Sequence, residues 1–221
     1  MTTPANIPDL TGPDLCALCA KQGHSCCATD PATGHLSFPL SVPEWQRLKA
    51  WSALATEASS GADFDRADKE ACAASRALEL TPPKPHTDAA PPPMGDDCCQ
   101  AWPNSPDFIL SMNSLFTKEK KRVAQLFPAR GTHFSLRLRK DGACVFLGNA
   151  GCRLPRTVRP WYCLLFPAWM LNGRPALFTA PGCLIAKRAM NPAHAVGIMG
   201  VNLDDLREIY SSLRRDWGLT Y

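Results

Sequence analysis

The chain has 221 residues, of which 45% are apolar and 20% are charged, a composition typical of a globular protein rather than a disordered or fibrous one. Its formal net charge of +4 is small for this length and argues against a nucleic-acid partner. Two counts are high, 21 prolines and 11 cysteines, and the cysteines are the unusual feature.

Local patterns predict helices mixed with short antiparallel strands, an α+β fold in one small domain over residues 1–221. A helix is predicted to begin near Ser41, a cap residue followed by Pro43 and Glu44, and to end before Ser59. Residues 56–104 are rich in alanine and proline, and we interpret them as a low-complexity insertion. Within it, residues 62–80 favour a helix and the proline-rich part a surface loop.

Further elements follow the insertion. A helix is predicted from Ser105 to Phe127, and Phe134, Leu136 and Leu138 alternate with polar residues as in a half-buried strand. Asp141 and Gly142 form a turn, and Asn172-Gly173 is a strong signal for a β-hairpin. A C-terminal helix is predicted over residues 202–218. Its apolar face is formed by Leu206, Ile209, Tyr210, Leu213 and Trp217.

The beginning of the chain shows no basic patch followed by an apolar stretch, so we expect no secretory signal and a cytoplasmic protein. The longest strongly apolar stretch, Trp161 to Leu171, is interrupted by Pro167 and is far shorter than the ~20 residues of a membrane span. We therefore expect no membrane partner. In a reducing cytoplasm, closely spaced cysteines are more often metal ligands or redox groups than disulfides.

The cysteines form two groups. In the first, Cys16 and Cys19 have the CxxC spacing that lets two thiolates bind one metal, and Cys26 lies near enough to add a third. The adjacent Cys27 is expected to point away from Cys26, so the two would more easily serve two sites than one ion. His24 is an alternative ligand, but a histidine in a surface loop is the more common case.

The second group contains Cys144, Cys152, Cys163 and Cys183. Around it the sequence reads as a Gly-x-Cys-x-Phe-Leu strand, a Gly-Cys turn and an Arg-Pro-x-x-Cys-x-x-Phe-Pro segment. Together with the first group, these motifs resemble the zinc- or iron-chelating cysteine-cluster family named for its CxxCxxCC signature, also called the YkgJ type. The resemblance covers residues 15–27 and 134–183. Here six residues separate Cys19 from Cys26 where the family has two, and Leu164 stands where the family usually has arginine.

This resemblance implies a bound metal centre, either zinc or an iron–sulfur cluster, and a distant relationship to flagellin lysine N-methylases. The eight cysteines of the two groups would suffice for two four-thiolate sites, or for one 4Fe–4S cluster with four thiols left for a second site, redox work or burial. Sulfur ligands exclude magnesium and calcium. Aromatic residues crowd the second group, which favours an iron–sulfur cluster over zinc; buried thiols without metal are the third alternative.

Three cysteines remain, Cys72, Cys98 and Cys99, and we expect them not to be ligands because they lie in or beside the insertion, although Cys98-Cys99 repeats the pairing of Cys26-Cys27. Arg159 is expected to donate hydrogen bonds to backbone carbonyls. Trp161 and Tyr162 are expected in the core.

The sequence therefore predicts a metal-binding protein that carries an electron or delivers metal. The alternative is an enzyme that modifies protein lysines with support from the metal centre, although no glycine-rich nucleotide loop is present in the sequence. A protein partner bound by the proline-rich segment is a third hypothesis.

Overall fold

The computed structural model describes residues 18–19, 38–58, 98–148, 151–178 and 183–219. Within these ranges it contains helices and three two-stranded antiparallel sheets. The helices are α2 (Val42–Ala58), α4 (Pro106–Leu115), α5 (Lys120–Leu126), α6 (Trp161–Leu165), α7 (Leu184–Arg188), α8 (Pro192–Ile198) and α9 (Leu203–Asp216). The strands are β1 (Cys99–Pro103), β2 (Thr132–Leu136), β3 (Leu147–Gly148), β4 (Gly151–Cys152), β5 (Ala168–Leu171) and β6 (Arg174–Leu177). No helix in the described ranges is long and apolar enough to cross a membrane.

Helix α2 begins where the sequence predicts, because Ser41 and Glu44 form a reciprocal cap. The Glu44 carboxylate accepts a hydrogen bond from the Ser41 backbone N–H at 2.8 Å, and the Glu44 N–H donates to Ser41 Oγ at 3.3 Å. The helix continues to Ala58. The predicted helix of residues 62–80 and the proline-rich loop lie outside the described residues, whereas residues 98–104, at the end of the predicted insertion, include strand β1.

The single helix predicted from Ser105 to Phe127 is wrong: the structure has two helices, α4 and α5, separated at Phe116 to Glu119. Ser105 caps α4 as predicted, with its side chain accepting from the Phe108 N–H. The segment between the helices contains no proline or glycine, and the apolar residues keep their helical spacing on both sides of it. The sequence therefore gives no local signal for the break. The bend brings Glu119 to Arg214 of α9, where the two side chains form an ion pair at 2.6 Å.

Strand β2 pairs antiparallel with β1, and both of its faces are covered. His133 and Ser135 are buried, whereas Phe134 and Leu136 are only partly buried. The alternation of apolar residues predicts the opposite, with Ser135 on the polar face. The reason is tertiary: the ring of His133 stacks on Phe108 at a centroid distance of 3.8 Å, and the Leu40 N–H donates to the Phe134 carbonyl at 2.7 Å.

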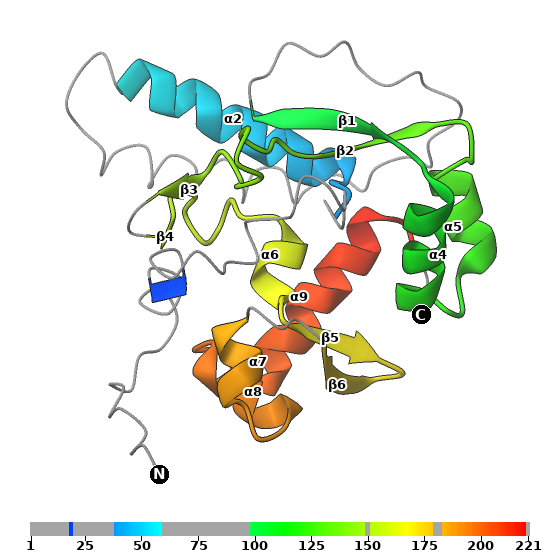
Figure 1. The fold of residues 1–221 in the computed structure, drawn as a ribbon, viewed down its shortest axis with the longest axis vertical. Helices are drawn as coiled ribbons and strands as arrows, with labels where there is room; N and C mark the ends of the chain where they lie inside the picture. Colours follow the sequence, from blue (N-terminus) through cyan, green and yellow to red (C-terminus); the bar gives the residue numbers. More distant parts are fainter. Residues whose placement is uncertain (1–17, 20–37, 59–97, 149–150, 179–182, 220–221) are drawn as a thin grey trace.

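The C-terminal half follows its local signals. Strands β5 and β6 form the predicted hairpin, in which Asn172 and Gly173 both have positive φ angles, 51° and 76°. Helix α9 is capped by Asn202 and ends before Gly218, which has a φ of 61°. In Figure 1, α9 (red) runs through the middle of the molecule, and it contacts α2, α6, α8 and β5.

Two separate apolar clusters form the core. The first core lies around α9, and its buried residues include Met112, Phe116, Leu165, Trp169, Leu206 and Leu213. The predicted apolar face of α9 is confirmed, and Trp161 and Tyr162 pack against this core as expected. The second core contains the buried residues Leu40, Leu48, Cys98, Cys99, Cys144, Phe146, Leu154 and Val158. It joins α2 to β1 and to the segment that carries Cys144 and Cys152.

Candidate metal centre

The second core brings together cysteines that are far apart in the sequence. Cys144 is buried in it, and the partly buried Cys152 packs against it. Cys98 and Cys99 are buried in the same cluster, 8% and 3% exposed, although the sequence places them beside an insertion. Four thiols from two segments therefore share one apolar environment, together with Phe146 and the partly buried Trp51.

Backbone hydrogen bonds explain why these segments meet. The Arg137 N–H donates to the Cys98 carbonyl at 2.8 Å, and the Val145 N–H donates to the Arg137 carbonyl at 3.0 Å. The chain after β2 therefore lies between the cysteine pair on one side and Cys144 on the other. Leu147 continues the connection, because its N–H donates to the Cys144 carbonyl at 2.9 Å and it pairs with Cys152 across β3 and β4.

Three arginines hold the carbonyl groups of this segment. Arg159 donates to the Leu154 carbonyl at 2.9 Å and to the Cys152 carbonyl at 3.4 Å, so its expected structural role is confirmed. Arg153 donates to the Val145 carbonyl at 2.6 Å, and Arg139 to the Leu147 carbonyl at 2.8 Å. These contacts fix the backbone of the segment that carries Cys144 and Cys152.

The other predicted ligands lie elsewhere. Cys163 is partly buried on α6, and Cys183 is buried at the N-cap of α7; neither belongs to the two core clusters of the described residues. Cys19 is partly buried, whereas Cys16, Cys26, Cys27 and Cys72 lie outside the described residues. Within the described ranges, no three histidine, cysteine, aspartate or glutamate side chains are arranged to hold a metal ion. The eight-cysteine ligand set therefore stays a prediction.

The sequence analysis does not identify Cys98 and Cys99 as part of this environment. A signal was present, because the pair repeats the adjacent arrangement of Cys26 and Cys27. The alanine- and proline-rich composition before the pair indicates a loop that contributes little to a core, and for this reason the sequence assigns Cys98 and Cys99 no role. Pairing of Cys99 with Leu136 shows instead that Cys99 is a residue of strand β1.

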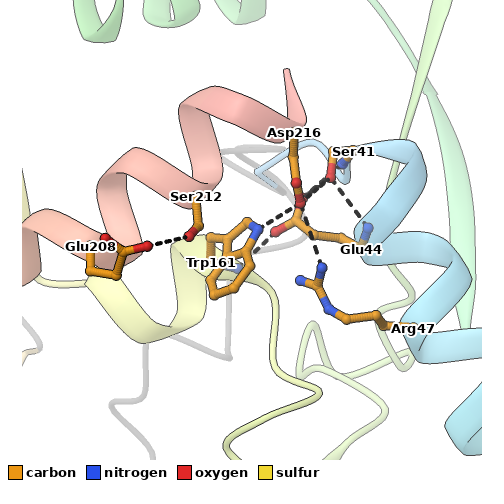
Figure 2. Close-up of polar contacts among 7 residues, drawn as sticks. All are labelled: Ser41, Glu44, Arg47, Trp161, Glu208, Ser212 and Asp216. Atoms are coloured by element: carbon orange, nitrogen blue, oxygen red, sulfur yellow. Dashed lines mark hydrogen bonds and ion pairs between the residues drawn. The ribbon is translucent and has the colours of Figure 1, made fainter. Parts of the chain in front are cut away.

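A polar network next to the second core fixes α2 against α6 and α9 (Figure 2). Glu44 Oε1 accepts from the Trp161 backbone N–H at 2.7 Å, and Oε2 accepts from Ser41 Oγ at 2.7 Å. Asp216 accepts from the Trp161 indole N–H at 2.7 Å and pairs with Arg47 at 3.5 Å. The guanidinium of Arg47 also lies over the Trp161 ring, 4.5 Å from its centroid.

Burial raises the pKa of Glu44 above its ordinary value, against the lowering effect of the hydrogen bonds from Ser41 and Trp161. A perturbed carboxyl group can mark a catalytic site. Here both carboxylate oxygens are occupied by hydrogen bonds within the fold, and Glu44 caps α2. We therefore interpret the network as a structural support for α6, the helix that carries Cys163, and for the part of α2 that packs on the second core.

Comparison of the chain with family models, with curated proteins and with solved structures finds no match. The resemblance to the cysteine-cluster family therefore stays a prediction that depends on the motifs alone.

Proposed function

We propose that the chain is a metal-binding protein that holds an iron–sulfur cluster or zinc through clustered cysteines. The main supporting observation is the second core, in which Cys98, Cys99, Cys144 and Cys152 share one apolar environment. Three of these cysteines are buried and Cys152 is partly buried, and they come from two segments that are far apart in the sequence.

The chemistry of these donors fits a soft metal. Thiolates select zinc, copper(I) and iron–sulfur clusters over magnesium and calcium, which take oxygen ligands. Charged groups in an apolar interior are normally paired or bound to metal, so a metal would allow these thiols to be present as thiolates. Phe146, Trp51 and Leu48 surround the thiols with apolar surface that would limit access of water.

Cys144 and Cys152 are the ligands that the motifs and the second core both support, and Cys16, Cys19, Cys26, Cys27, Cys163 and Cys183 complete the proposed set. An iron–sulfur cluster bound there would supply one-electron transfer, whereas zinc would supply a structural cross-link or a deliverable ion.

The test is metal analysis of the full-length protein purified without oxygen, together with acid-labile sulfide and an absorption spectrum. Iron and sulfide in a ratio near one identify a cluster, and a colourless protein with stoichiometric zinc identifies a zinc site. The Cys144→Ser/Cys152→Ser variant should lose most of the metal. Val158→Ala, which trims a buried apolar residue of the same second core, is the matched control and should keep it. A folded wild-type protein that contains no metal under these conditions would contradict the proposal.

A further inference from the structure

The adjacent cysteines Cys98 and Cys99 direct their thiols to the same place. Their Sγ atoms are 3.5 Å apart, and both side chains are buried in the second core. In a regular strand, successive side chains point to opposite faces. The pair stands at the entry to β1, where Cys99 is the first strand residue, so the regular alternation has not yet begun.

The separation of the two sulfur atoms matches two ligands of one metal ion. In a tetrahedral zinc site with Zn–S bonds of ~2.3 Å, neighbouring sulfur atoms are ~3.8 Å apart. The observed 3.5 Å is the length of an S–H···S contact between the two thiols, and it is also close to this edge length. In a 4Fe–4S cluster each iron takes one protein thiolate, so the thiolates are bound to different irons. Two thiols in direct contact are therefore better suited to bind one ion than to bind such a cluster.

A disulfide is a less suitable state for the same pair. Consecutive Cα atoms are ~3.8 Å apart across a trans peptide, whereas the Cα atoms of disulfide-bonded cysteines are usually ~4.4–6.8 Å apart. Closing the disulfide would therefore distort the backbone, which is held by its pairing with β2 and with the residue that follows β2. The Cys98 carbonyl accepts from the Arg137 N–H, and Cys99 pairs with Leu136.

Charge balance favours a divalent ion. Two thiolates carry two negative charges, which Zn²⁺ neutralises, and a neutral complex is less costly to bury in an apolar cluster than isolated thiolates are. On these grounds we propose that Cys98 and Cys99 together supply two ligands to a single thiophilic ion of the zinc type. The proposal adds to the metal centre two residues that the motifs leave out, and it rests on the proposed function because both require the chain to bind metal.

The experiment is a titration of the metal-free, reduced full-length protein with Zn²⁺ against a chromophoric chelator, and with Co²⁺ as a spectroscopic probe of sulfur ligands. The wild-type protein is compared with Cys98→Ala/Cys99→Ala, in which the buried positions stay apolar. We expect the double variant to bind Zn²⁺ at least ~100-fold more weakly. We also expect it to lose a large part of the sulfur-to-cobalt charge-transfer intensity, because two sulfur ligands are removed.

Val158→Ala controls for lost packing in the second core and should leave both readouts unchanged. The single variants Cys98→Ala and Cys99→Ala, each expected to weaken binding, serve the same test where the double variant does not fold. Unchanged Zn²⁺ affinity and an unchanged Co²⁺ spectrum would overturn the inference and leave the proposed function intact. So would a wild-type protein that carries iron and sulfide but binds neither Zn²⁺ nor Co²⁺. A wild-type protein that binds no metal of any kind would overturn both.

Discussion

Glu44, in the first turn of α2, accepts a hydrogen bond at 2.7 Å from the backbone N–H of Trp161, which lies 117 residues later at the start of α6. The first N–H groups of a helix have no partner within the helix. The Glu44 carboxylate therefore accepts hydrogen bonds at the N-termini of two helices. One comes from Ser41, just before α2, and the other comes from Trp161, the first residue of α6. This one side chain couples the orientation of α2 to that of α6.

Replacing Glu44 with alanine should lower the free energy of unfolding by about 3 kcal/mol, because it removes the cap of α2 and leaves the Trp161 N–H without its acceptor. Urea denaturation at pH 7 measures the change. Glu208→Ala removes an exposed glutamate of α9 and is the control, with little effect expected. Equal losses for the two variants would show that the Glu44 hydrogen bonds contribute nothing specific.

His133 should make the protein less stable in acid. Burial lowers the pKa of His133 from 6.5 to about 4, so between these values the unfolded chain binds more protons than the folded protein. The stability that neutral His133 contributes is therefore complete above pH 6.5 and is lost as the pH falls towards 4. The shift corresponds to about 3 kcal/mol at 1.36 kcal/mol per pKa unit.

This dependence is measured as the difference in unfolding free energy between the wild type and His133→Phe from pH 4.5 to 7.5. The raised pKa of Glu44 acts in the opposite direction, since stability falls as that carboxyl ionises above its unfolded pKa near 4.5, but this contribution is common to both proteins and cancels. Val158→Ala, which changes no titratable group, is the control and should keep the wild-type dependence. Parallel curves for wild type and His133→Phe would refute the prediction.

The ion pair between Arg214 and Glu119 should stabilise the bend between α4 and α5. Its side chains are 7% and 15% exposed, and its atoms are 2.6 Å apart. Removing one partner leaves a poorly solvated charge, so Glu119→Ala should reduce the free energy of unfolding by about 3 kcal/mol.

The pair Arg207 and Asp204 has nearly the same separation, 2.7 Å, but its side chains are 54% and 90% exposed. Arg207→Ala is therefore the matched control, and its effect in the same chemical denaturation should be far smaller because water screens the charges. Comparable losses at the two pairs would mean that burial is not the cause.

On the proposed function, removing metal should loosen the second core more than the first. The amide protons of Arg137 and Leu147 donate to the carbonyls of Cys98 and Cys144, and the Val145 amide donates to the Arg137 carbonyl between them. Without metal these segments lose a cross-link, so the amides should exchange faster with deuterium. The Trp217 amide, which is bonded to the Leu213 carbonyl in α9, should change little. Hydrogen exchange before and after anaerobic chelation measures both, and a uniform change across the chain would argue against a metal in the second core.

Features that depend on neighbouring residues were predictable from the sequence. The start of α2 at Ser41, the hairpin at Asn172 and Gly173 and the C-terminal helix are all confirmed. Each has a signal within a few residues, namely a cap, a turn that needs positive φ angles, or an apolar face with helical spacing. The role of Cys144 as a ligand, inferred from the motif around it, stays a prediction.

Local sequence signals were enough for the start of α2, the β5–β6 hairpin, the C-terminal helix and the carbonyl contacts of Arg159. The break before α5, the burial of His133 and Ser135, and the presence of Cys98, Cys99 and Cys144 in one core depend on tertiary packing. Caps and turns are made by adjacent residues, whereas these features need partners many positions away. Local periodicity carries no information about which distant segment covers a face. The pairing of β1 with β2 is what shows that Cys99, although it follows a proline-rich segment, is part of the core.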